Sequence, residues 1–288
     1  MRKRFALAAV TMAFLLAVPA CTGVFYQPAG RLYATPVEAG LPYREYIFTA
    51  PGGAQLGGWW IPAAEGTEEK GTIIHCHGNA QNMTAHFMNV AWLAKEGYNL
   101  FVFDYEGYGA SEGVATPAHV NGDIVAALEA GMQLTRERER NIGRRLKVIA
   151  YGQSLGGAAL ARALADFEEK ARLSGVIEEA GFYSYQAIAR QKLAQWWLTW
   201  PMQWLGLLLV SDEYSPERHI ASIAPVPLLV VHGDADAVVP VSHGRRIFEL
   251  ARDPKEYWEI PGGGHIEAFH VNGGAYRPRL LAWLAALP

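Results

Sequence analysis

The stretch Val148-Ile149-Ala150-Tyr151-Gly152-Gln153-Ser154-Leu155-Gly156 decides the fold of this 288-residue chain. Its first four residues predict a buried strand, and the small and apolar residues after Ser154 predict a helix. Gly-x-Ser-x-Gly between a strand and a helix is typical of a nucleophile elbow, a turn so sharp that only glycine fits two residues before and after the serine. The alternative is an ordinary glycine turn. Ser154 is therefore the candidate nucleophile.

A serine hydroxyl is a weak nucleophile and needs a base within hydrogen-bond reach. Gly262-Gly263-Gly264-His265 follows the last strand pattern, at residues 257–260, and precedes a final helical pattern at 276–287. This order predicts a loop at the carboxyl ends of the strands, and its glycines allow a close approach to the elbow. An isolated surface histidine is the alternative. We take His265 as the candidate base.

The third member of such a site is a carboxylate that orients the imidazole. The segment His232-Gly233-Asp234-Ala235-Asp236-Ala237-Val238-Val239-Pro240 follows an apolar strand pattern and offers two. Asp234 is nearer the strand end and is expected to bond backbone amides of the turn. Asp236 lies further into the loop, where its side chain can reach across, and is the favoured candidate.

A tetrahedral intermediate also needs donors for its negative oxygen. His77-Gly78-Asn79-Ala80 follows another strand pattern, and we expect the backbone amides of Asn79 and Leu155 to form this oxyanion hole. His75 and His77 are a conceivable metal pair, but no third ligand lies nearby in the sequence. Neither a metal nor a cofactor is expected.

Short apolar runs recur along the chain and predict buried parallel strands at residues 72–76, 100–103, 146–151, 176–177, 227–231 and 257–260. Helical patterns separate them, for example Met83, Phe87, Val90 and Ala91, which share one helical face. Residues 44–48 and 55–61 predict an antiparallel hairpin before them. The fold class is therefore α/β, with a mostly parallel twisted sheet and helices on both faces.

The N-terminus has the layout of an export signal. A basic start, Arg2-Lys3-Arg4, precedes an uncharged apolar stretch at residues 5–18 and then Pro19-Ala20-Cys21. The apolar stretch is shorter than the roughly 20 residues that span a bilayer. Residues 1–20 are therefore expected to be a signal peptide, although simple secretion and an uncleaved N-terminal anchor remain alternatives.

Val18-Pro19-Ala20-Cys21 resembles the lipobox of bacterial lipoproteins, apart from Val18 and Pro19. That resemblance implies lipid on Cys21 as the first mature residue, and Thr22 implies the outer membrane over the inner. The only other cysteine is Cys76, so no internal disulfide scaffold is expected. Losing residues 1–20 removes three positive charges and no negative ones, taking the net charge from −3 to −6. Nothing in this balance favours a nucleic-acid partner.

Together these motifs, with the segment from Phe103 to Ser111, resemble the α/β-hydrolase superfamily and, within it, Bem46-like serine hydrolases. The resemblance covers residues 43–288, which form the expected hydrolase domain. In that family the second acidic residue of the His-Gly-Asp-x-Asp motif is the triad acid, which supports Asp236. The Asp104 segment is structural there, a tight turn after a strand. A serine at the elbow argues against relatives that use an aspartate nucleophile.

Residues 181–225 form an insert that is longer than a simple crossover needs. Four of the nine tryptophans lie there, within residues 196–210. The segment is interpreted as a small helical cap, either a buried helix pair, an apolar lid or a face that rests on lipid.

The expected function is hydrolysis of an ester or thioester with an apolar acyl part, through an acyl-enzyme on Ser154. The expected partners are a small-molecule ester or acyl substrate and a membrane that holds the lipid anchor. A serine peptidase of the same fold would need an extra domain or a carboxylate site for the substrate amine. A non-catalytic binding lipoprotein would be expected to have lost a triad member. These two functions are kept as alternatives.

Overall fold

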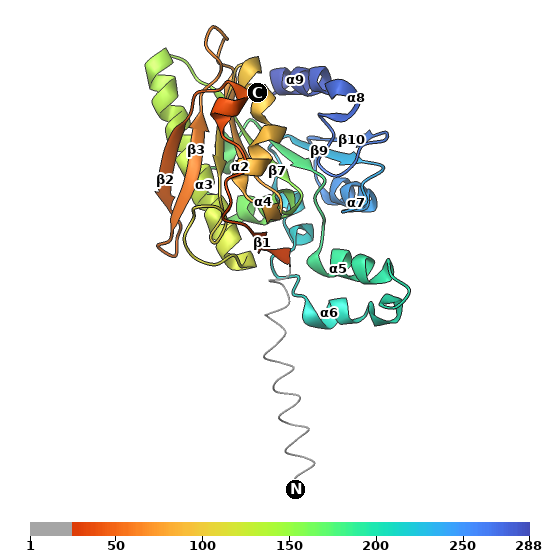
Figure 1. The fold of residues 1–288 in the computed structure, drawn as a ribbon. Coiled ribbons are helices and arrows are strands. Elements are labelled where there is room, and N and C mark those ends of the chain that lie inside the picture. The colour runs from red at the N-terminus through yellow and green to blue at the C-terminus, as the bar shows by residue number, and fades with distance from the viewer. Residues whose placement is uncertain (1–24) are drawn as a thin grey trace.

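A computed structural model describes residues 25–288, so the signal segment and Cys21 lie outside the described residues. One sheet organises the chain, with strand order β10-β9-β8-β7-β4-β6-β3-β2 (Figure 1). Its strands are β2 Arg44–Thr49, β3 Gln55–Ile61, β4 Gly71–Cys76, β6 Tyr98–Phe103, β7 Lys147–Gln153, β8 Gly175–Glu179, β9 Leu228–Gly233 and β10 Lys255–Ile260. Two further short strands, β1 Gln27–Pro28 and β5 Ala80–Gln81, pair with each other in parallel.

The sheet is mixed at one edge and parallel elsewhere. β2 and β3 form the predicted antiparallel hairpin, and β3 also runs antiparallel to β6. All the other neighbouring strands are parallel, in the order β6, β4, β7, β8, β9 and β10. Strands β4, β6, β8 and β9 are buried along their whole length, as expected of parallel strands covered on both faces. The predicted fold class is therefore confirmed.

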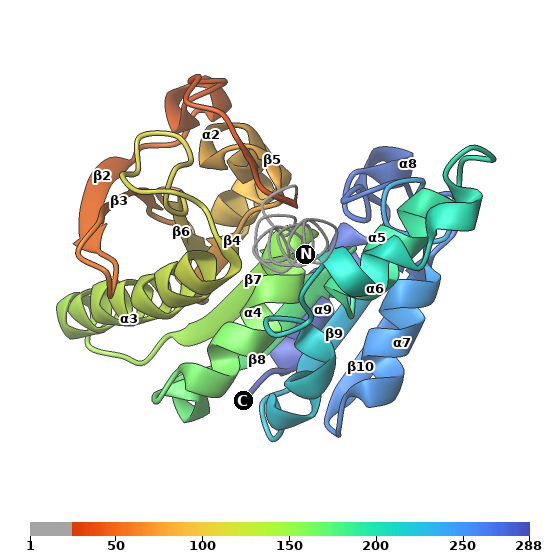
Figure 2. The ribbon, with the colours of Figure 1, turned by 90° about the horizontal axis from the view of Figure 1, so that it is seen from below.

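Helices cover both faces of the sheet. The α-helices are α2 Met83–His86, α3 Pro117–Ile142, α4 Leu155–Asp166, α5 Tyr185–Ala194, α6 Leu205–Leu209, α7 Ser242–Leu250, α8 Val271–Gly274 and α9 Arg277–Ala286. The 3₁₀ helices are η2 Pro36–Ala39, η3 Phe87–Asn89, η4 Ala91–Glu96, η5 Lys170–Arg172, η6 Trp200–Met202, η7 Pro216–Arg218 and η8 Ile220–Ser222. Helices α3, α4 and α7 pack into one apolar core, and α2, η3, η4 and α9 pack into a second core on the opposite face (Figure 2).

Local sequence sets the ends of the long helix α3. Thr116 caps its first turn by accepting a hydrogen bond from the amide of His119, and Pro117 follows at the first helical position. Gly143 ends the helix with a positive φ of 71°. These signals fix α3 against the sheet, where it packs on α4, the helix that the elbow opens.

The predicted helix from Met83 is not continuous. It breaks into α2, η3 and η4. The amide of Val90 donates to the carbonyl of Phe87 and the amide of Leu93 to that of Val90, which is the i to i−3 pattern of a 3₁₀ helix. A 3₁₀ helix has three residues per turn, so it aligns Phe87, Val90 and Leu93, which are all fully buried. The apolar face was predicted correctly, but the α-helical geometry holds only for α2 and is wrong for residues 87–96.

The insert lies between β8 and β9 and contains α5, η6, α6, η7 and η8. Helices α5 and α6 project below the sheet beside β1 (Figure 1). The four tryptophans of this segment are exposed, which disagrees with the buried helix pair. Among the described residues, no helix is both long and apolar enough to cross a membrane.

Candidate active site

Ser154 lies in a strained turn between β7 and α4. Its φ of 54° and ψ of −116° fall outside the regions that non-glycine residues favour. A Cβ atom on Gly152 would lie 2.6 Å from the Cα of Gly157, and one on Gly156 would lie 2.2 Å from the carbonyl oxygen of Cys76. The flanking glycines are therefore required by backbone contacts, as the elbow pattern predicts.

The structure brings together the three residues proposed from separate motifs. The Nε2 atom of His265 lies 2.9 Å from the Oγ atom of Ser154. The Nδ1 atom of the same ring lies 2.8 Å from Oδ2 of Asp236. In this geometry His265 donates from Nδ1 to the carboxylate, which leaves Nε2 free to accept the serine proton. The arrangement is that of a base between a nucleophile and an orienting acid.

The two candidate acids have different surroundings. Asp236 is buried and its Oδ1 accepts hydrogen bonds from the amides of Val238 and Val239, both at 2.8 Å. Burial by itself raises the pKa of Asp236, but contacts with His232 and His265 outweigh it and hold the pKa well below its usual value. Asp234 instead accepts from the amide of Gly262 at 2.7 Å, within the turn.

The expected oxyanion segment lies beside the serine. A Cβ atom on Gly78 would lie 3.5 Å from the Cβ of Ser154, so this backbone packs directly on the elbow. Asn79, Ser154 and Leu155 line one cavity. The side chain of Asn79 accepts from the amide of Gln27 at 2.8 Å and from the hydroxyl of Tyr108 at 3.1 Å. Two hydrogen bonds thus hold the side chain of Asn79 in place at the wall of the cavity.

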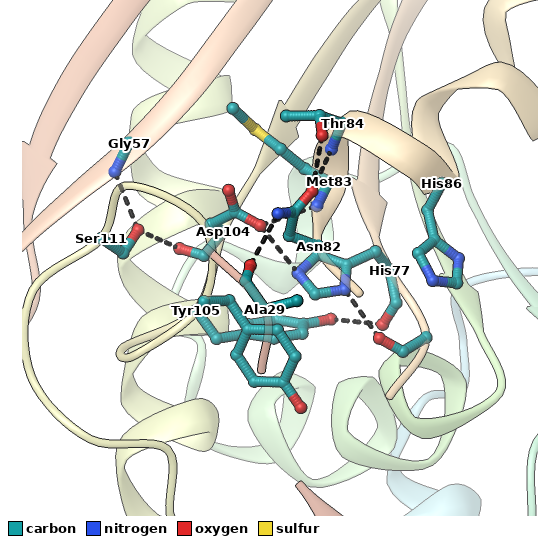
Figure 3. A network of polar contacts seen from close by, with 12 residues as sticks. Ala29, Gly57, His77, Asn82, Met83, Thr84, His86, Asp104, Tyr105 and Ser111 are labelled. Atoms are coloured by element: carbon teal, nitrogen blue, oxygen red, sulfur yellow. Dashed lines mark hydrogen bonds and ion pairs between the residues drawn. The ribbon is translucent and has the colours of Figure 1, made fainter. Parts of the chain in front are cut away.

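A buried polar network supports that segment from behind (Figure 3). Oδ1 of Asp104 lies 3.3 Å from Nε2 of His77 and accepts from the amide of Met83 at 2.7 Å. The hydroxyl of Tyr105 donates to the carbonyl of His77 at 2.9 Å. Asp104 therefore ties the turn after β6 to residues 77–80, where the oxyanion hole is expected, and to the start of α2.

The two histidines suggested as a metal pair each contact protein groups. Nε2 of His75 lies 2.9 Å from the side-chain oxygen of Gln153, and Nδ1 of His77 lies 2.7 Å from the carbonyl of Gly78. Burial lowers the pKa of His75 to about 3, so its ring is neutral. Both rings thus take part in packing around β4 and β7.

Glu179, at the end of β8, is a site residue that sequence reasoning missed. Its Oε1 accepts from the amide of Ala268 at 3.1 Å, three residues after His265. Its Oε2 accepts from Gln153 at 2.7 Å and from the hydroxyl of Tyr151. The carboxylate thereby joins the elbow strand to the histidine loop. The available signal was an acidic pair, Glu178-Glu179, directly after an apolar strand pattern.

A cavity of about 470 Å³ opens at Ser154. Its lining is mainly apolar and comes from the N-terminal segment, the segment between β4 and β5, the elbow, the cap and the loop after β9. The lining residues are Phe25, Gln27, Asn79, Ser154, Leu155, Phe182, Ile188, Ala189, Lys192, Leu193, Leu205, Gly206, Leu209, Val210, Val238 and Val239. Lys192 is the one charged residue among them.

The fold and the site define an α/β-hydrolase. Residues 67–224 match the family described as serine aminopeptidase, S33. The chain is 35% identical over 264 residues to protein YfhR of Escherichia coli strain K12, which covers 90% of this chain and 86% of YfhR. It is 26% identical over 227 residues to protein bem46 of Schizosaccharomyces pombe, covering 77% of this chain and 70% of that protein. The chain belongs to the serine aminopeptidase S33 family, as a Bem46-like α/β-hydrolase.

Solved structures agree with this fold. The esterase Pf2001 of Pyrococcus furiosus superposes with a TM-score of 0.70 at 19% identity, covering 91% of this chain and 98% of the esterase. Acylaminoacyl peptidase of Pyrococcus horikoshii gives a TM-score of 0.62 at 20% identity, covering 85% of this chain but only 41% of the peptidase. Esterases and peptidases therefore share this architecture, and the chain is a hydrolase of that general type.

Proposed function

We propose that this hydrolase cleaves carboxylic esters or thioesters with an apolar acyl part, through an acyl-enzyme on Ser154. The observation that carries the proposal is the position of the Ser154 hydroxyl. It lies 2.9 Å from Nε2 of His265 and lines a mainly apolar cavity of about 470 Å³. A nucleophile with its base at the wall of an apolar cavity suits acyl transfer from a substrate with an apolar chain.

The proposed steps follow from the geometry. As the Ser154 oxygen attacks the substrate carbonyl, His265 takes the serine proton and Asp236 stabilises the resulting imidazolium. The amides of Leu155 and Asn79 bind the oxyanion of the tetrahedral intermediate. The bond to the leaving oxygen or sulfur then breaks, and His265 returns its proton to that leaving group. Water, deprotonated by His265, then attacks the acyl-enzyme carbonyl. As the bond to the Ser154 oxygen breaks, His265 returns the proton to that oxygen, and the acid and free Ser154 are released.

A serine peptidase is the second candidate, because the family description and one structural neighbour name peptidases. An aminopeptidase needs a group that binds the free amine of its substrate. Among the described residues, the cavity is lined by no carboxylate, and its one charge is the cation Lys192. A cation there would repel a protonated amine. The lining therefore favours an ester or thioester over an aminopeptidase substrate.

A non-catalytic binding protein is the third candidate. Such a protein has no need to keep a base hydrogen-bonded to a nucleophile at the cavity wall. Here Ser154, His265 and Asp236 are aligned at 2.8 to 2.9 Å. The strained φ of 54° at Ser154 also has a cost that pure binding would not require. Both features favour an enzyme.

We also propose that the protein is exported and anchored by lipid on Cys21 at the periplasmic face of a membrane. The support is the signal-like sequence of residues 1–20 and the lipobox-like segment that ends in Cys21. In this proposal the partners are a small ester or acyl substrate and the membrane, with no nucleic acid.

Labelling with a fluorophosphonate probe tests the catalytic proposal. The wild type is expected to be labelled and to hydrolyse p-nitrophenyl esters, with aminoacyl p-nitroanilides as the peptidase comparison. Ser154→Ala should lose both labelling and ester hydrolysis while keeping its circular dichroism spectrum. Ser222→Ala is a control, because Ser222 is exposed and lies outside the cavity lining. Full ester hydrolysis by folded Ser154→Ala would reject the mechanism, and faster anilide hydrolysis would favour the peptidase.

A further inference from the structure

The cap carries a group of exposed large apolar side chains, here called the cap surface. Its members and their exposed fractions are Trp196 71%, Trp197 85%, Leu198 66%, Trp200 61%, Trp204 56%, Leu207 48% and Leu208 51%. Residues 193–211 are 19 consecutive positions without Asp, Glu, Lys or Arg. Many exposed apolar side chains gathered in one segment point to a contact with a protein or a membrane.

Helix α6 shows that this surface is not simply the outside of a soluble cap. Leu205 and Leu209 line the cavity, whereas Leu207 and Leu208 are about half exposed outside it. A helix that is apolar all round belongs in a protein core or in lipid. Leu207 and Leu208 border a second, open hollow that polar residues such as Asp212 and Glu217 also line. Exposed leucines next to polar groups suit the interface of a bilayer, where apolar side chains meet the headgroups.

The first described residues, Phe25 and Tyr26, lie beside the cap, and this position indicates what the cap surface contacts. Phe25 lines the cavity, and its ring lies 5.2 Å from that of Tyr185 in the cap helix α5. The hydroxyl of Tyr26 lies 2.9 Å from the hydroxyl of Tyr185. Cys21 precedes Phe25 by four residues, a distance of about 14 Å at full extension. Lipid on Cys21 would therefore hold the bilayer near the cavity and the cap.

We propose that the cap surface docks on a lipid bilayer, with the cavity of Ser154 facing the membrane. Indole rings favour the water–bilayer interface, where an apolar ring and a polar N–H are both accommodated. The cap is built of short helical pieces on a folded domain, so it lies on the bilayer and does not cross it. A substrate whose acyl chain sits in the membrane can then enter the apolar cavity directly. This last consequence rests on the proposed hydrolase activity, and the choice of a bilayer as the occupant rests in part on the lipid anchor proposed at Cys21.

Quenching of tryptophan fluorescence by brominated lipid tests the docking. The full chain is reconstituted into phosphatidylcholine vesicles with bromine on the acyl chains. The other five tryptophans are Trp59, Trp60, Trp92, Trp258 and Trp283, which are buried or partly buried in the domain. Quenching is therefore expected in the wild type and in Ser154→Ala. It should be lost when all four cap tryptophans are replaced by Phe.

A matched pair of charge substitutions localises the contact. Trp197→Glu with Leu207→Glu should abolish the quenching of the remaining cap tryptophans. Ile47→Glu should leave the quenching unchanged, because Ile47 is 70% exposed but lies on β2, far from α5 and α6 (Figure 1). Equal quenching in the two variants, or none in the wild type, would overturn the proposal. So would a dimer in detergent solution that Trp197→Glu converts to monomer, because a second copy would then cover the surface.

Discussion

Nε2 of His232 lies 3.4 Å from Oδ2 of Asp236, the same oxygen that Nδ1 of His265 contacts. His232 is fully buried, and its Nε2 also lies 2.8 Å from the carbonyl of Val239. Burial lowers the pKa of His232, but the contacts with Asp236 and Val239 raise it by more, so the net shift is upward. The carboxylate is therefore held by buried groups on one side and presents the other side to His265.

The first prediction separates the two acids of this loop. Asp236→Asn should lower kcat by up to about 10⁴-fold, by analogy with the serine protease case, since an amide facing Nδ1 favours the wrong imidazole tautomer. The melting temperature should move little, because the remaining amide oxygen can still accept from the backbone amides of Val238 and Val239. Asp234→Asn weakens only the bond to Gly262, so kcat per folded molecule should be kept.

Titration of active sites with the fluorophosphonate, together with thermal melts, measures both effects. Normalising kcat to labelled sites removes the contribution of unfolded protein. Loss of activity in Asp234→Asn with retention in Asp236→Asn would contradict the assignment of Asp236.

The second prediction concerns the tight packing of the elbow. A Cβ atom on Gly156 would lie 2.2 Å from the carbonyl of Cys76 and 2.5 Å from that of His77. Gly156→Ala must therefore displace the backbone that leads into the oxyanion segment, at a cost of about 1 to 3 kcal/mol in unfolding free energy and a loss of activity. Gly122→Ala is the control. Gly122 lies in helix α3, and a Cβ atom on it would meet only Pro51, at an ordinary contact distance of 3.4 Å. Urea unfolding should show Gly122→Ala as stable as the wild type or more stable.

Much of this architecture could be predicted from local patterns. Strands β4, β6 and β9 follow from apolar runs, since parallel strands are buried on both faces. The elbow follows from its glycines, and the order Ser154, Asp236, His265 follows from loops at the ends of separate strands. These are consequences of short stretches of sequence, so no distant contact had to be known.

Contacts between distant segments could not be predicted in the same way. The bond from the amide of Ala268 to Glu179 joins residues 89 positions apart, and nothing local marks that amide as a partner. The exposure of Trp197 depends on how η6 and α6 fold against α5 within the cap. The breakdown of the helix at Met83 into 3₁₀ turns likewise depends on the sheet it packs against, because the apolar spacing suits both helix types.

The third prediction tests the role of Glu179 as a positioning residue. Its two oxygens both accept hydrogen bonds, one from the histidine loop and the other from the elbow strand. Gln has a single acceptor oxygen, so Glu179→Gln must lose one of these contacts. We expect kcat to fall by up to about 100-fold through misplacement of His265, with little change in KM. Glu267→Gln, an exposed change in the same loop, should leave kcat unchanged. A raised KM with normal kcat would contradict this role.

The fourth prediction concerns Cys21, which lies outside the described residues. If one sulfur carries the anchor, Cys21→Ser should prevent incorporation of a labelled fatty acid and release the protein from washed membranes. Cys76→Ser is the matched control, because Cys76 is fully buried in β4 and not available to a lipid-transferring enzyme. Equal fatty-acid labelling of wild type and Cys21→Ser would rule out the lipobox.

The fifth prediction is a pH dependence of stability that arises from Glu178. Burial raises the pKa of Glu178 from its usual 4.5 to about 7. Between these values the folded protein keeps the proton that the unfolded chain has lost, so the unfolded chain binds fewer protons and stability falls as pH rises. The stabilisation by the protonated Glu178 is fully present below pH 4.5 and is lost as pH rises through 7. Its size is about 3 kcal/mol of unfolding free energy at most.

Glu178→Gln removes this titrating group without a large change in shape. The slope of unfolding free energy against pH from 5 to 8 should therefore become shallower in Glu178→Gln, as measured by urea unfolding at each pH. Part of the slope should remain, because burial also raises the pKa of Asp123 to about 7. The exposed change Glu45→Gln serves as control and should leave the wild-type slope intact. Parallel slopes for the wild type and Glu178→Gln would contradict this prediction, because they would show that Glu178 keeps its charge in the folded protein. A buried partner such as His232, whose charge acts to lower the pKa of Glu178, would then stabilise the carboxylate.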